Sequence, residues 1–487
     1  MSAEWVTRIR SNPLFRERAF VDGDWIDADG GETQPIDNPA SRETIGQVPR
    51  LGAAETRRAV EAADRAMKAW RRQTAEARGV ILYRWYELML EHEDTLAAIM
   101  TLEQGKPLAE AAGEIRYAAS FLKWFAEEAR RAYGRTIPPA NPDQHIVVIR
   151  QPIGVCAAIT PWNFPSSMIT RKAGAALAAG CSMVVKPASA TPYSALALAE
   201  LASRAGVPAG VFSVVTGSAR EIAGEMTANP LVRKVSFTGS TEVGSELMRQ
   251  AATHVQKISL ELGGNAPFVV FDDADLDAAV DGAIAAKFRN TGQTCVCVNR
   301  FYVQDSVHDA FVGKLKERIE NLRLGDGFDP SSEIAPLINQ EAVDKVLSHV
   351  ADATAGGAEV VAGGELDARG GNYVLPTLLT GVRQSMQVMQ EETFGPVVAV
   401  STFATEEEAI DLANDTPFGL AAYFYSENVR RVWRVAEAIE AGMIGINAGL
   451  ISNAAAPFGG VKSSGLGREG AMEGLDEYLE TKYLLMG

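Results

Sequence analysis

The stretch IGVCAAITPWNFPSSMITRKAGAALAAGCSMVVK, residues 153–186, decides the fold. Its apolar run at 155–159 is followed by an Ala-rich segment of helical length at 166–180 and by a second apolar run at 182–185. Short apolar strands that alternate with helices are typical of a parallel sheet covered by helices. The stretch therefore predicts a β–α–β unit of an α/β fold.

The same alternation continues further along the chain and predicts a Rossmann-like dinucleotide fold. Upstream, residues 53–130 are expected to be helical, because Val60, Ala63 and Met67 fall on one helical face. Downstream, residues 266–460 are expected to form a second α/β unit. The other strands expected in the two units are 211–215, 233–237, 256–260, 267–271, 301–303, 396–403, 420–424 and 443–447. The other helices expected in the first unit are 192–205, 219–228 and 241–252.

The sequence changes character after the helical region. Residues 134–142 contain three prolines, which disfavour a helix, and they lead into a strand-like run at 146–149. Residues 478–485 are expected to form an edge strand. We interpret 134–149 as an arm that projects between segments of the fold, although an ordinary surface loop would have the same composition.

Composition excludes several classes of function. The 487 residues carry a formal net charge of −16, which argues against nucleic acid or an anionic membrane as a partner. The four cysteines are too few for a disulfide scaffold and indicate a reducing compartment, so we expect a cytoplasmic protein. The five histidines are scattered singly, and we expect no metal site. Neither a membrane-spanning run nor a secretory signal is recognisable.

Two segments could bind a dinucleotide. The sequence FTGSTEVG at 237–244 follows an expected strand and opens an expected helix, where free backbone N–H groups attract phosphate. It lacks the first glycine of the full G-x-G-x-x-G fingerprint, so Gly239 also fits a plain turn. Lys186 and Ser189 follow another strand. The small neutral Ser189 beside a cation permits NADP as well as NAD, although a surface lysine without a role is the alternative.

Two other residues are candidates for the chemistry itself. Cys295 lies in the polar, glycine-containing loop 290–297, which suits a nucleophilic thiolate better than a buried structural cysteine. Glu261 ends an apolar strand, where apolar neighbours raise the pKa of a carboxylate and favour a general base. A helix cap or a salt bridge would account for Glu261 equally well.

Together these segments resemble the aldehyde dehydrogenase superfamily over nearly the whole chain and in the family's order. Each motif is short, but their conjunction is highly specific. The motifs that carry the resemblance are TPWNFP at 160–165, KPA at 186–188, FTGS at 237–240, LELGG at 260–264, GQTC at 292–295 and ETFGP at 392–396.

The resemblance implies a role for each matching residue. Cys295 would attack the aldehyde carbon to give a thiohemiacetal and then a thioester. The Asn163 side chain and the Cys295 backbone N–H would stabilise the oxyanion, and Glu261 would activate the hydrolytic water. Lys172 and Glu469 would carry protons away from Glu261. The residues implied in cofactor binding are Thr160, Pro161, Trp162, Lys186, Ser189, Phe237, Gly239, Ser240, Gly244, Glu392 and Phe394.

The resemblance sharpens toward succinate-semialdehyde dehydrogenases at 169–172, 287–290 and 449–453. In that subfamily the substrate carries an ω-carboxylate, which needs cationic and hydroxyl partners. Arg171, Arg289 and Ser452 would supply them, unless the arginines form helix-surface salt bridges. Glutarate semialdehyde, one methylene longer, is the nearest alternative substrate. A CoA-acylating enzyme and a non-catalytic protein on the same fold are less favoured, because Glu261, Cys295 and Asn163 are all retained.

The resemblance also implies a domain plan. Residues 1–130 and 152–262 would form the dinucleotide-binding domain, and 263–463 the catalytic domain. Residues 131–151 and 464–487 would form oligomerisation elements of a homodimer or homotetramer. Cys297, two residues after Cys295, is either a bystander or the partner in a reversible disulfide that switches activity off.

Overall fold

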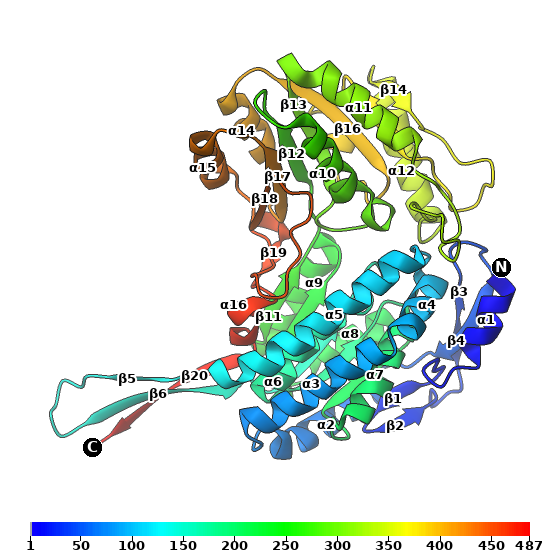
Figure 1. Ribbon diagram of the computed structural model, residues 1–487. Coiled ribbons are helices and arrows are strands. Elements are labelled where there is room, and N and C mark those ends of the chain that lie inside the picture. The colour runs from blue at the N-terminus through cyan, green and yellow to red at the C-terminus, as the bar shows by residue number, and fades with distance from the viewer. Residues whose placement is uncertain (1) are drawn as a thin grey trace.

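The computed structural model describes residues 2–487, and within this range two large sheets lie in two adjoining units of the molecule, each covered by helices (Figure 1). The first sheet combines a parallel centre with short antiparallel strands at its edges. In spatial order its strands are β19 (Gly465–Leu466), β11 (Lys257–Glu261), β10 (Val232–Thr238), β7 (Val155–Ile159), β8 (Ser182–Lys186), β9 (Phe212–Val214), β1 (Ala19–Val21) and β2 (Asp24–Ile26).

The β7–α6–β8 unit forms as the sequence predicts. Strands β7 and β8 are parallel neighbours, and α6 (Ser167–Ala179) connects them. Every residue of α6 is buried, because small alanines let the helix pack closely against the sheet and against α5. The helix ends at Gly180, whose φ of 96° is readily adopted only by glycine. This unit delivers the end of β7 and the start of α6 to the cleft between the sheets.

The expected helical region is confirmed as four consecutive helices. Val60, Ala63 and Met67 are buried, as the helical periodicity predicts. The longest of the four, α5 (Leu108–Glu128), packs between two other helices of the first layer, α3 and α6 (Figure 1). The three preceding helices are α2 (Ala53–Trp70), α3 (Ala75–Glu91) and α4 (Glu93–Gln104). The helices that follow β8, β9 and β10 are α7 (Pro192–Ala205), α8 (Ala219–Ala228) and α9 (Thr241–Ala251).

The second sheet lies in the C-terminal half and is parallel except at one edge. Helices cover both of its faces (Figure 1). In spatial order its strands are β14 (Glu359–Ala362), β15 (Thr377–Thr380), β16 (Val397–Phe403), β13 (Val298–Gln304), β12 (Ala266–Val270), β17 (Ala421–Tyr425) and β18 (Met443–Ile446). Its helices include α10 (Leu276–Phe288), α11 (His308–Glu320), α12 (Gln340–Ala355), α14 (Glu406–Asn414) and α15 (Val429–Ala438).

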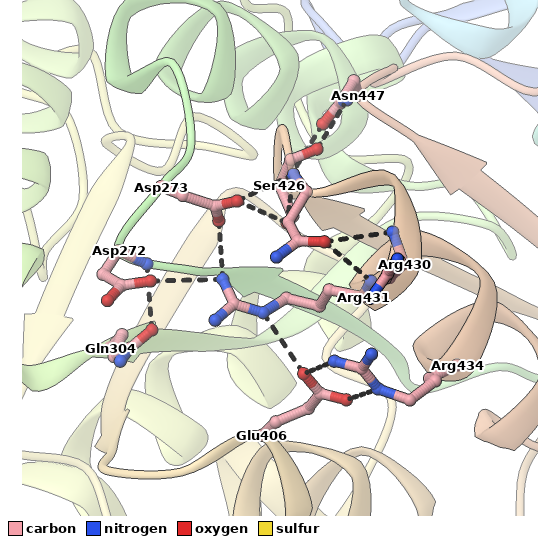
Figure 2. Close-up of polar contacts among 10 residues, drawn as sticks. Asp272, Asp273, Gln304, Glu406, Ser426, Arg430, Arg431, Arg434 and Asn447 are labelled. Atoms are coloured by element: carbon pink, nitrogen blue, oxygen red, sulfur yellow. Dashed lines mark hydrogen bonds and ion pairs between the residues drawn. The ribbon is translucent and has the colours of Figure 1, made fainter.

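An ion-pair network ties α14 and α15 to the end of β12 (Figure 2). The Arg431 guanidinium contacts Asp273 at 2.7 Å, Asp272 at 3.1 Å and Glu406 at 3.2 Å. Arg434 binds Glu406 through two nitrogens, each at 2.7 Å. The fork of an arginine suits such paired contacts, so this network joins three elements through well-matched charges.

The arm is confirmed as a three-stranded antiparallel ribbon that projects from the body of the molecule (Figure 1). It consists of β5 (Arg135–Ile137), β6 (His145–Pro152) and β20 (Leu479–Met486). Strand β20 pairs along its full length with β6, and β6 with β5, which leaves β20 at an edge as expected. The side chains of β20 beyond Leu479 are exposed.

Several short strands are not predicted from the sequence. The N-terminal strands β1 and β2 have three residues each, which is too short for a periodic pattern. Strand β14 is an exposed edge strand, and β19 has only two residues. The strands β3 (Thr33–Asp37) and β4 (Thr44–Pro49) form a separate hairpin with polar exposed positions. Among the described residues, no helix is long and apolar enough to cross a membrane.

Candidate active site

A cleft of about 390 Å³ lies between the two large sheets. It takes residues from the end of β10 and the loop after β7 on one side, and from α12 and the loop before β16 on the other. Eight residues singled out from the sequence lie in its wall, namely Pro161, Trp162, Asn163, Gly239, Ser240, Cys295, Glu392 and Phe394.

Cys295 is partly exposed to this cleft, although its polar neighbours upstream are buried. Cys295 is thus not fully buried, in line with the expectation for this residue, while the rest of the loop is. The amide side chains of this loop can be buried because they form hydrogen bonds within the loop. For example, Gln293 Nε2 donates to Asn290 O at 3.1 Å. At Gly264 a Cβ atom would lie 2.5 Å from Cys295 O, so glycine lets the neighbouring chain pass directly against the cysteine.

The Cys295 thiol is not an activated thiolate in this structure. Burial raises its pKa to about 12, and the charge of Arg171 only partly offsets that rise. The Glu392 and Glu261 carboxylates raise it further. Since a thiol with this pKa is protonated at neutral pH, its attack on a carbonyl requires a base.

Glu261 has the environment of such a base. It ends β11, is 2% exposed, and neither carboxylate oxygen has a hydrogen-bond partner among residues 2–487. Burial, and then the charge of Glu469, raise its pKa well above the usual value, against the opposing effect of Arg171 and Lys172. A buried carboxylate with a raised pKa can accept a proton near neutral pH.

Lys172 and Glu469, the expected proton relay, do lie together beside Glu261. Lys172 Nζ forms an ion pair with Glu469 and donates to Thr238 Oγ1 at 2.6 Å. Glu469 also pairs with Arg171 Nε, and all of these side chains are buried. The strand β19 and the backbone bridge between Phe458 and Glu469 place this segment against the end of β11. Proton transfer through the cluster stays a prediction.

Asn163 is fixed by contacts that cross from the first helical layer to the cysteine loop. Its Nδ2 donates to Gln293 O at 3.0 Å. Its backbone carbonyl accepts from Lys106 Nζ at 2.7 Å and from Asn290 Nδ2 at 3.0 Å. Lys106, buried and paired with Glu114 at 2.6 Å, was missed because no local pattern marks it. These contacts leave the second N–H of the Asn163 amide available to an oxyanion.

A second pocket opens on the other side of Cys295. It contains all three residues expected to bind a substrate carboxylate. Arg171 stacks on the Phe458 ring at 4.4 Å, and Arg289 on the Phe164 ring at 5.2 Å. Neither arginine lies on a helix surface. The residues that line the pocket are Tyr117, Phe164, Met168, Arg171, Arg289, Thr294, Cys295, Val296, Ser452 and Phe458.

The remaining cofactor candidates lie at or near the carboxyl ends of β7, β8 and β10 and in α9. Lys186 is buried at the end of β8, where burial lowers its pKa to about 8, and its Nζ contacts Ser189 Oγ at 3.2 Å. Ser240 caps α9 by accepting from Val243 N at 3.4 Å. Gly244 faces Leu262, which a Cβ atom would approach to 2.4 Å. Thr160, Lys186, Ser189, Phe237 and Gly244 do not belong to the cleft wall.

The opposite wall holds Glu392 and Phe394. Glu392 Oε1 accepts from Gly264 N at 3.1 Å, and burial raises the pKa of this carboxyl to about 7. Phe394 has a positive φ of 54° and meets the Trp162 ring edge-on, with centroids 5.6 Å apart. Lys345 of α12 lines the same wall and was missed by sequence analysis.

These features fit an elongated, anionic dinucleotide. Lys186 is a buried ammonium that contacts the neutral hydroxyl of Ser189, and the positive end of α9 lies at the cleft. A Cβ at Gly239 would lie 2.4 Å from the Phe237 ring, so a larger residue there would require this ring to move. The described residues contain no group of three or more side chains arranged to hold a metal ion.

Cys297 is buried behind the reactive loop. Its Sγ donates to Lys287 O at 3.3 Å, at the end of α10. Both cysteines are free thiols. A disulfide between Cys295 and Cys297 stays a prediction.

The chain belongs to the aldehyde dehydrogenase family, which matches residues 25–484. It is thus an NAD(P)-dependent enzyme of that class, and the expected family and fold are confirmed. It is 62% identical over 480 residues to a glutarate-semialdehyde dehydrogenase of Pseudomonas aeruginosa, which covers 99% of both chains. It is 60% identical to an NADP-dependent succinate-semialdehyde dehydrogenase of Escherichia coli, covering 99% of this chain and 100% of the relative. A crystal structure of an E. coli NADP-dependent enzyme superposes with a TM-score of 0.97 at 61% identity, covering 97% of this chain and 98% of the other.

Proposed function

We propose that this enzyme oxidises succinate semialdehyde to succinate. The single observation that carries the proposal is the pocket behind Cys295, where Arg171, Arg289 and Ser452 converge. The two terminal nitrogens of Arg171 are buried and have no hydrogen-bond partner in the described chain. A guanidinium with unused donors suits a carboxylate, so the chemistry of the site matches a substrate with an aldehyde at one end and a carboxylate at the other.

Cys295, Asn163 and Glu261 would carry the chemistry. Glu261 takes the proton of the Cys295 thiol, and the sulfur bonds to the aldehyde carbon. The resulting oxyanion accepts a hydrogen bond from the free Asn163 N–H, a contact worth about 3 kcal/mol in comparable sites. When bound, the dinucleotide would supply the hydride acceptor for this oxidation. Glu261, again deprotonated, then draws a proton from water, whose oxygen attacks the thioester carbon. The carbon–sulfur bond breaks, the acid is released, and the proton held by Glu261 returns to the Cys295 sulfur.

Residues of the cleft would hold the cofactor, and we propose NADP over NAD. Lys186 and Ser189 carry no negative charge that would repel a 2′-phosphate, and the E. coli relative is named for NADP. Glu392 would bind the hydroxyls of the nicotinamide-side ribose, and Phe394 would help to place the ring. Lys172 and Glu469 would return protons from Glu261 toward solvent.

Glutarate semialdehyde is the second candidate substrate. The P. aeruginosa relative is named for it at 62% identity. One methylene in a pocket contributes only about 1–3 kcal/mol to discrimination, so we propose that both semialdehydes are used. We also propose a cytoplasmic homodimer or homotetramer that assembles through the arm. The domain boundaries given above are part of the same proposal.

Replacing Arg289 by alanine tests the substrate. Loss of a charge-assisted contact should raise the KM for succinate semialdehyde by about 10- to 100-fold, and leave the KM for butanal within about twofold. Arg84→Ala, which removes an exposed arginine on α3, is the control and should change neither KM. Steady-state kinetics with NADP and with NAD would measure both. Equal effects of Arg289→Ala on the two aldehydes would refute the carboxylate site.

A further inference from the structure

Tyr117 is a pocket residue to which sequence analysis assigns nothing. It lies on α5 and lines the pocket behind Cys295 together with both arginines and Ser452. Its hydroxyl oxygen is buried, and among the described residues it interacts only with the Ser452 hydroxyl, which lines the same pocket. A buried hydroxyl that is not fully satisfied by the fold is destabilising, which makes this one a candidate for contact with a ligand.

We propose that the Tyr117 hydroxyl donates a hydrogen bond to the distal carboxylate of the substrate and contributes to selectivity for charged over neutral aldehydes. This inference rests on the proposed function, because it requires an anion in the same pocket.

The phenol is held in place by its surroundings. The Tyr117 ring meets the Phe121 ring edge-on, at 4.9 Å between centroids and an angle of 68°. The helix that carries both residues packs between α3 and α6, and α6 carries Arg171. A donor on a packed helix needs little ordering when the substrate arrives, which increases its contribution to binding.

The charge state makes Tyr117 a donor. Burial is the largest effect and raises the pKa of Tyr117 above its usual value, although Arg171 and Arg289 oppose the rise. The phenol therefore keeps its proton at neutral pH. A carboxylate offers about four acceptor positions on two oxygens, more than one arginine fork can fill. The Tyr117 hydroxyl, Arg289 and Ser452 approach from different elements and can occupy the others.

A second buried tyrosine beside the site behaves differently. Tyr423 lies next to the cysteine loop, and its hydroxyl donates to Val296 O at 2.9 Å. That tyrosine is satisfied by the backbone, whereas the hydroxyl of Tyr117 has only the Ser452 hydroxyl of the same pocket beside it. The contrast indicates that Tyr117 does not serve the folded structure through its oxygen.

Tyr117→Phe removes only this oxygen and tests the inference. The KM for succinate semialdehyde should rise about tenfold, as expected for a lost hydrogen bond to a charged group, and that for butanal should stay within about twofold. Tyr193→Phe is the matched control, because the Tyr193 hydroxyl is likewise buried, has no hydrogen-bond partner in the described chain and lies on α7, outside the pocket. It should leave both KM values unchanged.

Thermal unfolding gives a second, independent readout. Without ligand, Tyr117→Phe should be at least as stable as the wild type, because a buried hydroxyl that is not fully satisfied is lost. With the product succinate added, the stabilisation should be clearly smaller than in the wild type. A purely structural role would instead lower the stability of the free protein and leave the succinate shift intact.

The outcomes separate this inference from the proposed function. If Arg289→Ala discriminates between the aldehydes and Tyr117→Phe does not, the role of Tyr117 is refuted while the carboxylate site stands. If neither variant discriminates, the carboxylate site itself is refuted. If Tyr117→Phe raises both KM values equally, the hydroxyl does not contact the carboxylate.

Discussion

Two charged clusters in this enzyme contrast in how completely their atoms are paired. The Arg431–Glu406 network in the second sheet is partly exposed, and its carboxylates and guanidiniums contact each other at 2.7–3.2 Å (Figure 2). The cluster of Arg171, Glu261 and Glu469 is almost fully buried. Even so, both oxygens of Glu261 and two nitrogens of Arg171 have no partner in the part of the chain that the structure describes.

The difference teaches where binding and chemistry reside. Taking a charge out of water is costly unless hydrogen bonds replace the lost solvation. In the network around Arg431, ion pairs and hydrogen bonds within the protein replace the lost solvation, so no ligand is needed to pair its charges. The cluster around Glu261 does not meet that requirement, and it lies beside the thiol of Cys295. Unpaired buried charge next to a nucleophile is the signature expected of groups that act on a substrate.

Removing the nucleophile should have the largest effect. Cys295→Ala should lower kcat by more than about 10³-fold, because no other thiol lines the cleft or the pocket. Steady-state production of NADPH would measure it. Cofactor binding, followed by fluorescence, should persist and serves as the control. Substantial turnover by this variant would contradict a covalent route.

Removing the base should have the next largest effect. Glu261→Gln should lower steady-state turnover by about 10²–10⁴-fold, since the thioester would wait for unassisted hydrolysis. Rapid mixing should show that the first turnover also slows, because the Cys295 thiol loses the base that deprotonates it. In the wild type, the deacylation rate should increase as the pH rises through the elevated pKa of Glu261. A normal steady state would exclude Glu261 as the base.

The smallest expected effects are on stability, and they should have opposite signs in the two clusters. The folded pKa of Glu261 is raised, so ionising it opposes folding as pH rises above the unfolded value. Glu261→Gln should therefore increase thermal stability, more at pH 8 than at pH 5. The pKa of Glu406 is lowered, chiefly by its hydrogen bond with Arg434, so its contribution is present at neutral pH and is lost as pH falls.

Glu406→Gln should therefore decrease the free energy of unfolding by about 1 kcal/mol at pH 7 and leave kcat unchanged. Thermal or urea unfolding at two pH values would measure both variants. If the two substitutions changed stability in the same direction, the contrast between the clusters would be lost.

Sequence analysis recovers what short, local patterns encode. The alternation from 153 onward predicts β7, α6 and β8 to within about two residues. The motifs around Asn163, Glu261 and Cys295 predict residues that the fold brings to one place. Local patterns do not predict the hydrogen bonds that let the cysteine loop be buried, because polar residues by themselves indicate an exposed segment.

Tyr117 and Lys106 show the limit more clearly. Tyr117 lies on α5 and Lys106 in the short loop before it, far from Cys295 in the sequence and within a region whose main pattern is helical. What makes them part of the site is the packing of α5 against α6 and the reach of Lys106 Nζ to Asn163 O. Contacts of this kind depend on tertiary structure and leave no periodic or local signal.

The return of the chain through β19 to the first sheet has a consequence for biosynthesis. Glu469 reaches Lys172 and Arg171 only after β19 has paired with β11, which was translated some two hundred residues earlier. Domains begin to fold in N-terminal order as they leave the ribosome. A nascent chain in which the cysteine loop has already been synthesised would thus still lack Glu469, the ion-pair partner of Arg171 and Lys172. The complete active site would form only after the last residues of the chain have been translated.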